Sequence, residues 1–398
     1  MTLEMPPNES SFDLPDFRLP NFQENPYPYY QAARDISPIF WSPRHRQYFV
    51  LGGDAMRAVL RQKEFIVDSP FRASRILFGR TIVDVDGEEH ARLRSVTNRG
   101  LVPAKYPEYI DQIVKPIIHD QLKPLIQNHG GDFVNDFANH VPTRIMSTII
   151  GIPVEEYETF YQLSIPITQF LDVANQDNLA KAKAAMSTLT SMVIEICNHK
   201  RTSPDDTIIG SLLKAQASGA PISDEEIIRQ VGLMIPAAID TTNRLIGNAL
   251  YLLVRYPIWQ KKIRQSPDWV FPFIEEVMRY EPPIHSSIRI VKEAVTIEGI
   301  DLPQGALLNI NFAAANRDAS CFENPDAFNP MRDSVKRHFS FGGGKHQCMG
   351  RSFAILEVAE VVLAIVNTGK ELYFQPDEPC CIEGVAFRSP AALRLILK

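Results

Sequence analysis

One long helix, predicted over residues 223–255, limits the folds open to this chain more than any other feature of the sequence. It begins at Ser223, with Glu226 three residues later in the pattern of a capping box, and it ends before Pro257. At about 1.5 Å per residue such a helix spans about 50 Å. Its middle, residues 233–238, is apolar on every side, so we expect it to pass through the core of a large helical domain.

The same helix carries polar residues where a core helix usually has none. Pro236 lacks an amide proton and its ring presses on the carbonyl of Gly232, which predicts a kink. Asp240, Thr241 and Thr242 follow directly. In the plainest interpretation the threonines bond back to carbonyls four residues earlier and Asp240 pairs with a basic residue. A kinked, acid-bearing core helix is nevertheless more typical of a functional site.

The remainder of the chain divides into strand-like and helical stretches. A hairpin is predicted with strands at 38–41 and 47–51, and we expect it to share a sheet with the strand-like pieces of 289–310. We predict a mainly α fold with small β-sheets (α+β) in a single domain, 1–398. Its β-rich part covers about 37–52 and 285–312 and the C-terminal strands, and its helical part covers about 88–280 and 351–368, with helix stops at Gly100, Gly151 and Pro257.

Composition excludes several classes of protein. The 398 residues include 41 Lys and Arg against 47 Asp and Glu, a net charge of −6, which disfavours a nucleic-acid binder. No apolar run approaches the roughly 18 residues of a membrane span, and the first residues lack the pattern of a secretory signal. Five scattered cysteines without a Cys-x-x-Cys pair argue against a disulfide framework or a structural zinc site. We therefore expect a cytoplasmic protein without a membrane anchor.

The most distinctive motif is the run Phe-Gly-Gly-Gly-Lys-His-Gln-Cys-Met-Gly at 341–350. Its three glycines let the backbone approach a flat, bulky group closely. A helix is predicted from Arg351, so Cys348 stands at a helix entrance, where amide dipoles stabilise a thiolate. This position suits a metal ligand or a nucleophile; an inert, buried cysteine is the alternative.

This motif resembles the cysteine loop of the cytochrome P450 family of haem-thiolate monooxygenases, Phe-Gly-x-Gly-x-His-x-Cys-x-Gly. The matching positions are Phe341, Gly342, Gly344, His346, Cys348 and Gly350. Further family motifs match in the same order along nearly the whole chain: His90 with Arg94, Ala237 to Thr242, Glu276 with Arg279, Arg289, and Arg332. The resemblance is to the soluble bacterial type, and it implies the P450 fold with a long helix crossing over the haem.

The resemblance also implies roles for these residues. Cys348 would be the axial thiolate ligand of the iron of haem b. The other contacts between the haem and the protein would come from His90, Arg94, Arg289, Phe341, Gly342, His346 and Gly350. Glu276, Arg279 and Arg332 would form a structural ion-pair network. Asp240 and Thr241 would be the catalytic acid and alcohol that handle protons during oxygen activation. Ala238 departs from the family's glycine, and this departure predicts a narrower or reshaped oxygen groove.

The predicted substrate is a small, largely apolar organic molecule. By resemblance its pocket is lined by Val85, Leu233, Ala237, Ala238, Ile284, His285, Ile288, Val385 and Phe387, most of which are apolar. Arg72, Arg75, Arg80 and His285 are candidates for binding a carboxylate, although loop arginines are usually solvated. Terpenoids, fatty acids, polyketides and aromatic acids remain open, and a role in secondary metabolism fits all of them.

The same family pattern predicts partners. Electrons would come from NAD(P)H through a ferredoxin or flavodoxin that docks on a basic patch of Arg92, Arg99, Lys336, Arg337 and Lys345. We expect a monomer. The alternatives are a peroxide-driven haem hydroxylase, a haem-binding sensor without turnover, and a hydrolase with Cys348 as nucleophile. The pair Asp240 and Thr241 favours the monooxygenase over the first two.

Overall fold

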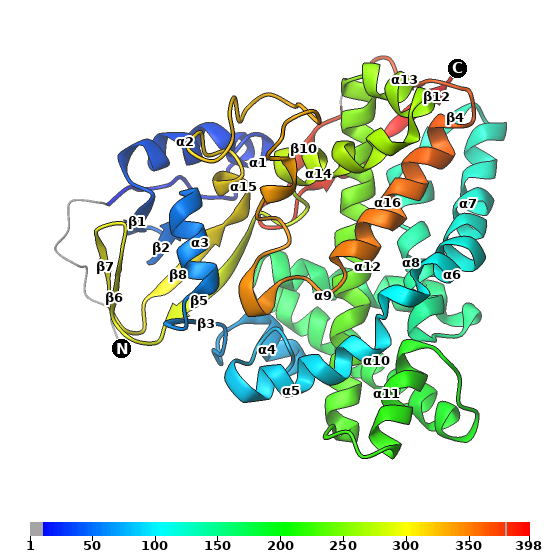
Figure 1. Cartoon of the computed structure of the whole chain (residues 1–398), viewed down its shortest axis with the longest axis horizontal. Coiled ribbons are helices and arrows are strands. Elements are labelled where there is room, and N and C mark those ends of the chain that lie inside the picture. The colour runs from blue at the N-terminus through cyan, green and yellow to red at the C-terminus, as the bar shows by residue number, and fades with distance from the viewer. Residues whose placement is uncertain (1–10, 379) are drawn as a thin grey trace. The chain divides into compact units, whose positions relative to one another are not determined.

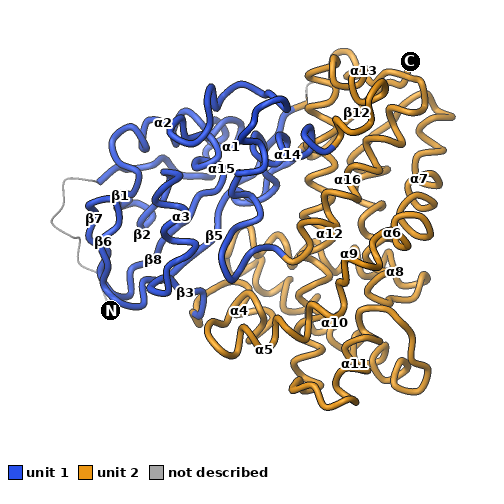
Figure 2. Tube along the Cα trace, in the orientation of Figure 1, with its two compact units in different colours: residues 1–68, 271–348, 381–389 blue, residues 69–270, 349–380, 390–398 orange. Residues whose placement is uncertain are grey.

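The structure is a computed structural model that describes residues 11–378 and 380–398. It is rich in helices and has small sheets, as the sequence predicts (Figure 1). Contacts within the chain divide it into two compact units, each assembled from separate stretches of sequence (Figure 2). Of the described residues, unit 1 comprises 11–68, 271–348 and 381–389, and unit 2 comprises 69–270, 349–378, 380 and 390–398.

Unit 1 is organised by a five-stranded sheet of order β1-β2-β8-β5-β3. The strands are β1 (Ile39–Ser42), β2 (Gln47–Val50), β3 (Phe65–Ile66), β5 (Ser286–Val291) and β8 (Leu307–Asn311). β1 and β2 form the predicted hairpin, with Phe40 opposite Phe49. β2 pairs in parallel with β8, which in turn pairs antiparallel with β5. The expectation that the two β regions share one sheet is therefore confirmed.

Helices and shorter strands complete unit 1. These elements are α1 (Pro20–Glu24), α2 (Tyr27–Ile36), α3 (Gly53–Arg61), α14 (Val270–Tyr280), β6 (Val295–Ile297), β7 (Ile300–Leu302), α15 (Phe312–Ala315), β10 (Ile382–Glu383) and β11 (Ser389–Pro390). One apolar core joins the sheet to α3 through Met56 and Val59, which are buried against Val50, Leu308 and Ile310. The branched and aromatic residues of the strands supply most of this buried surface, which is what stabilises short strands.

Unit 2 is mostly helical. Its helices are α4 (Ala73–Phe78), α5 (Gly87–Thr97), α6 (Tyr106–Tyr109), α7 (Lys115–Gln127), α8 (Val141–Ile150), α9 (Tyr157–Asp172), α10 (Gln176–Thr202), α11 (Ile208–Ala217), α12 (Asp224–Arg255), α13 (Ile258–Gln265) and α16 (Arg351–Val366). A small sheet of order β4-β12-β9 joins Gly130–Asp132, Arg394–Leu397 and Leu372–Phe374. The predicted stop at Gly151 is confirmed, because α8 ends there with φ at 100°.

The long helix is α12, and it packs on α8, α9, α10 and α16 within unit 2 (Figure 1). The capping box is formed: the Ser223 hydroxyl accepts from the Glu226 amide, and the Glu226 carboxylate accepts from the Ser223 amide. Pro236 lies inside the helix. Within the apolar stretch 233–238, Ile235 and Pro236 are buried, whereas Ala237, one of the predicted pocket residues, is exposed. One strip of the helix is therefore not covered by core side chains.

Candidate functional site

The cysteine loop of unit 1 is a tight turn that requires glycine at two positions. Gly342 and Gly344 adopt φ of 65° and 62°, in the left-handed region that favours glycine. A Cβ on Gly344 would lie 2.2 Å from the carbonyl oxygen of Leu60 on α3, so the loop lies directly against that helix. The amide of Cys348 donates to the Phe341 carbonyl over 2.9 Å and closes the loop.

The loop leaves the Cys348 side chain exposed, whereas Cys197 is buried and its pKa is raised by that burial. An exposed thiol at a closed turn can reach a metal ion, which a thiol packed in a core cannot. Within residues 11–378 and 380–398 no three His, Cys, Asp or Glu side chains are grouped so that they could hold a metal ion. A metal at Cys348 would therefore need ligands from a bound group, as the iron of haem has in its macrocycle.

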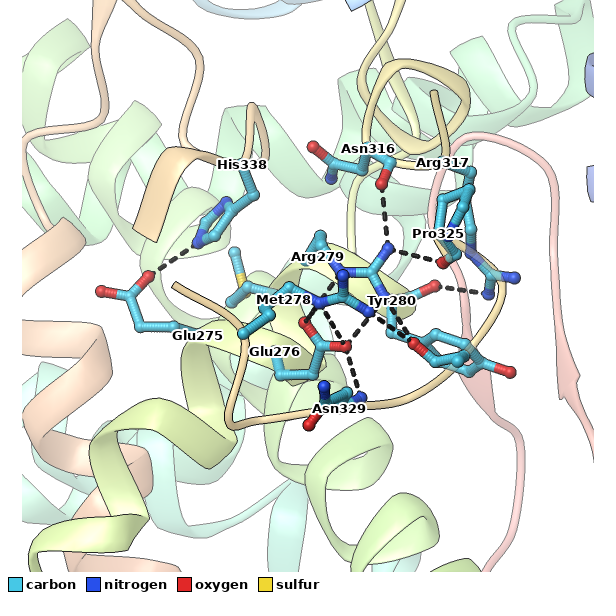
Figure 3. Close-up of polar contacts among 12 residues, drawn as sticks. Glu275, Glu276, Met278, Arg279, Tyr280, Asn316, Arg317, Pro325, Asn329 and His338 are labelled. Atoms are coloured by element: carbon cyan, nitrogen blue, oxygen red, sulfur yellow. Dashed lines mark hydrogen bonds and ion pairs between the residues drawn. The ribbon is translucent and has the colours of Figure 1, made fainter. Parts of the chain in front are cut away.

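The residues just before the loop are hydrogen-bonded to α14 and to Asn316. The Asn316 amide side chain donates to Ser340 Oγ over 2.7 Å and accepts from the Phe339 amide over 2.7 Å. Ser340 Oγ in turn donates to the Met278 carbonyl of α14 over 2.6 Å. His338 and Glu275, both buried, make a further contact of 2.7 Å (Figure 3). These bonds fix where the cysteine loop starts.

Glu276 lies at the centre of the neighbouring ion-pair network. Arg279 Nε and Nη2 donate to its two carboxylate oxygens over 2.7 and 2.8 Å, and the Asn329 amide donates over 2.7 Å (Figure 3). Arg332 Nε adds a contact of 3.1 Å. Both Glu276 and Arg279 side chains are fully buried, and Arg279 also donates to the carbonyls of Asn316 and Pro325. The structure brings the three predicted network residues together with all their charges paired.

The other predicted haem contacts fall in both units. In unit 2, His90 and Arg94 lie four residues apart on α5, with His90 buried and Arg94 half-buried. In unit 1, Arg289 on β5 is buried and donates to the Ile288 carbonyl over 2.8 Å. His346 lies in the helical turn η8 (Gly344–His346), half-buried.

Asp240 and Thr241 lie on the partly uncovered face of α12. Arg244, one turn on, donates from Nε to Asp240 Oδ2 over 2.8 Å. The Thr241 hydroxyl donates to the Ala237 carbonyl over 2.7 Å. Both bonds were predicted from the sequence: a threonine bonded to the carbonyl four residues earlier, and Asp240 paired with a basic residue. The Thr241 oxygen can still accept a hydrogen bond. Asp240 is thus an anchored carboxylate beside a half-buried hydroxyl, an arrangement that can move a proton along the helix.

Comparison with known proteins settles the family. The cytochrome P450 family model matches residues 17–368. The chain belongs to the cytochrome P450 family. Its members are haem-thiolate monooxygenases, oxidoreductases that bind haem b through a cysteine thiolate and receive electrons from NAD(P)H indirectly, through redox partners. When bound, the haem supplies the oxygen-activating chemistry, and the protein supplies its binding, orientation and protons.

Individual P450s resemble this chain over most of its length. The biotin biosynthesis cytochrome P450 of Bacillus subtilis is 28% identical over 347 residues, covering 84% of this chain and 87% of that protein. Pulcherriminic acid synthase of the same organism is 22% identical, and the match covers 94% of this chain and 95% of that protein. The structure of P450BioI with an acyl carrier protein ligated to hexadec-9Z-enoic acid matches with a TM-score of 0.88 and 25% identity, covering 94% and 99%. The structure of CYP109E1 of Bacillus megaterium in complex with testosterone matches with a TM-score of 0.85 and 26% identity. This match covers 94% of this chain and 99% of that chain. In the part of this P450 that the structure describes, no helix is long and apolar enough to cross a membrane.

The residues predicted to line the substrate pocket of this P450 differ in exposure. Val85 and Leu233 are buried in unit 2, where Ala238 is half-buried. In unit 1, the segment that begins at Ile284 pairs with the C-terminal turn: Ile284 forms a β-bridge with Phe387, and the His285 amide donates to the Ala386 carbonyl over 2.8 Å. Ile288, Val385 and Phe387 are half-buried.

His285 belongs to a buried polar cluster that the sequence does not reveal. Its side chain is 1% exposed and lies 3.8 Å from the carboxylate of Glu281. The Tyr27 hydroxyl donates to that carboxylate over 2.9 Å, and Arg317 stacks on the Tyr27 ring at 3.7 Å. Burial lowers the pKa of His285 to about 4. The expectation that His285 binds a substrate carboxylate is therefore not supported, since the side chain is buried within unit 1.

A second buried arginine, Arg388, fixes the C-terminal turn. Its guanidinium donates to the carbonyls of Gln23, Glu24, Ile382 and Gly384. Gln23 and Glu24 lie more than 300 residues from Arg388, so only the fold identifies these two contacts.

One residue of the predicted basic patch is neutralised. Arg92 forms an ion pair with Glu226, the capping residue of α12, and donates to the Pro221 carbonyl. Its prediction as a free docking cation is therefore wrong. Arg99 in unit 2 and Lys336, Arg337 and Lys345 in unit 1 are exposed.

Proposed function

We propose that this cytochrome P450 inserts one oxygen atom of O₂ into a largely apolar organic substrate, with electrons delivered from NAD(P)H by a ferredoxin or flavodoxin. The observation that carries this proposal is the Cys348 loop: an exposed thiol on a closed turn whose glycines lie against α3. We assign the thiolate ligand to Cys348 because the other cysteines lack such a turn. His90, Arg94, Arg289 and His346 would bind the haem propionates as cations.

The apolar substrate is supported by two observations. The predicted lining residues with partial exposure are Ala237, Ala238, Ile284, Ile288, Val385 and Phe387, all apolar. Similar P450s have been solved with a fatty acyl chain on a carrier protein and with testosterone, both largely apolar molecules. Asp240, held by Arg244, and Thr241 would handle the protons that oxygen activation consumes, which favours O₂ over peroxide as oxidant.

The proposed electron donor is acidic. Lys336, Arg337 and Lys345 are exposed close in sequence to the Cys348 loop, and such a cluster steers an anionic partner by long-range attraction. We further propose that the protein acts in the cytoplasm, since none of its five cysteines, all within the described ranges, forms a disulfide, which is typical of a reducing compartment. We also propose that the protein is a monomer.

The ligand assignment is tested by the carbon monoxide spectrum of the reduced holoprotein. A thiolate ligand gives a red-shifted Soret band, and we expect Cys348→Ser to lose it while the circular dichroism of the fold is kept. The control is Cys321→Ser, which removes a half-buried thiol of the same unit and should leave the band unchanged. A red-shifted band that survives in Cys348→Ser, or is lost in Cys321→Ser, contradicts the assignment.

A further inference from the structure

Segment 72–80 of unit 2 carries three arginines, and the structure separates them by their partners. Arg72 Nε lies 3.4 Å from Asp84 Oδ1, a fully buried carboxylate. Arg80 Nε donates to Glu89 Oε1 over 2.9 Å. These two positive charges are each compensated by a carboxylate of the protein itself, so neither needs a ligand.

Arg75, on α4 between them, has no such partner. Its guanidinium makes no hydrogen bond or ion pair with the residues in the described ranges, and its Nη1 atom is buried without a hydrogen-bond acceptor. A buried guanidinium N–H that lacks an acceptor is unfavourable, and a charged acceptor satisfies it best. Glu89, the nearby acid whose pKa Arg75 helps to lower, is already bound by Arg80. No described residue supplies an acceptor for Arg75 Nη1, so a bound ligand can supply it.

The backbone around Arg75 is fixed, so the guanidinium is presented from a defined position. Ser74 Oγ and Thr81 Oγ1 both donate to Asp84, over 2.5 and 2.6 Å. The Ile82 amide donates over 3.1 Å to Gln230 Oε1 on α12. α4 itself packs on α9, α10 and α12. A site that is held in place before a ligand arrives loses less entropy on binding.

Gln230, where this segment is attached, lies on the face of α12 that also carries Leu233, Ala237 and Thr241. At 100° per residue these four positions fall within one narrow strip of the helix. Eleven residues separate Gln230 from Thr241, which is about 16 Å along the axis. Between them this strip offers only apolar side chains, Leu233 and Ala237.

Large apolar side chains are also exposed beside Arg75 itself. Phe71 is 87% exposed and Ile76, the next residue along α4, is 42% exposed. An unpaired cation flanked by exposed apolar side chains is suited to a ligand with both an anionic group and an apolar body.

We propose that Arg75 binds the carboxylate of an elongated, apolar substrate whose opposite end lies toward Thr241. This inference rests on the proposed function and deepens it, because it selects long carboxylic acids from the apolar molecules left open above. Arg75 would determine which end of the substrate is oxidised. Binding of the carboxylate to Arg75 fixes one end, and the length of α12 between Gln230 and Thr241 sets how far the other end reaches.

Binding of matched acid and ester pairs to the holoprotein tests the site. Isothermal calorimetry measures straight-chain carboxylic acids of eight to sixteen carbons against their methyl esters, on the wild type, Arg75→Gln and Arg75→Lys. We expect the wild type to prefer the acid by about 10- to 100-fold at the best length. Arg75→Gln should bring acid and ester to equal affinity without changing the ester, and Arg75→Lys should restore part of the preference.

The control variant is Arg229→Gln, which removes an equal charge from α12 beside Gly79, where Arg229 is already paired with Glu225. It should keep the acid preference. The inference is overturned if the wild type binds no acid of the series, binds acids and esters equally, or keeps its preference in Arg75→Gln. Calorimetry requires no spectral change at the haem, so this result is independent of the carbon monoxide band that tests the proposed function.

Discussion

Glu357 gives the sharpest prediction about stability. It lies on α16 with its carboxyl buried, and Oε1 has no hydrogen-bond partner within the described ranges. Burial raises its pKa from 4.5 to about 8. At neutral pH the folded protein therefore keeps this carboxyl protonated, whereas the unfolded chain ionises it. Because the folded state binds the extra proton, the contribution of Glu357 to stability is greatest below pH 4.5 and falls as the pH rises toward 8.

The magnitude follows from the separation of the two pKa values. Between pH 4.5 and about pH 8 the folded state loses about 5 kcal/mol of stability through Glu357, and about 3 kcal/mol of this is already lost at pH 7. Glu357→Gln keeps the shape of the side chain and removes the titration. The buried amide brings an unsatisfied N–H that costs about 1–3 kcal/mol at every pH, so the diagnostic quantity is the pH dependence and not the stability at one pH.

The assay is denaturant unfolding of the holoprotein between pH 5 and 8. We expect the stability of the wild type relative to Glu357→Gln to fall by about 3 kcal/mol across this range. Glu360→Gln serves as the control, because Glu360 lies one turn later on α16, is only partly buried and has Lys115 nearby. Its pH dependence should be much weaker. Parallel curves for the wild type and Glu357→Gln would refute the reasoning.

Two further predictions concern unit 1. Gly344→Ala should lower the melting temperature and the haem content far more than Gly342→Ala, because both have positive φ but only at Gly344 would a Cβ meet a backbone oxygen, that of Leu60, at 2.2 Å. Equal losses in the two variants would contradict this account of the loop. His285 should make the protein sensitive to acid, because its pKa in the folded state, about 4, lies below the ordinary value of 6.5. The unfolded chain therefore gains the proton first. About 3 kcal/mol of folding stability is lost as the pH falls from 6.5 to 4. Unfolding of His285→Gln over the same range checks this, and an unchanged acid loss would show that another group is responsible.

Features encoded by neighbouring residues were predictable, and those that depend on distant contacts were not. The capping box of α12 and the pairing of Asp240 with a basic residue involve side chains within one turn, so their spacing in the sequence reveals them. The pairing of Arg92 with Glu226 joins residues far apart in the chain, and an arginine on a helix carries no local sign of such a partner. The exposure of Ala237 likewise depends on which segments pack on α12, which apolar patterning alone does not specify.

Contacts that only the fold creates also explain why the polar cluster around His285 was missed. Its members come from three segments: Tyr27, the stretch with Glu281 and His285, and Arg317. Each of these residues has an ordinary interpretation by itself. The sequence therefore could not predict that the His285 side chain is buried within unit 1.

The bonds around Asn316 have a consequence for exchange of the cofactor. Asn316, Ser340 and Met278 determine the start of the cysteine loop through hydrogen bonds within the protein, and Leu60 lies against its glycines. These bonds within unit 1 hold the start of the loop without any contact to a metal. On the proposed assignment of Cys348, a porphyrin that carries cobalt or manganese would meet the same turn and the same sulfur. The identity of the metal could then be varied separately from the protein ligand, which would make this loop a starting point for artificial metalloenzymes.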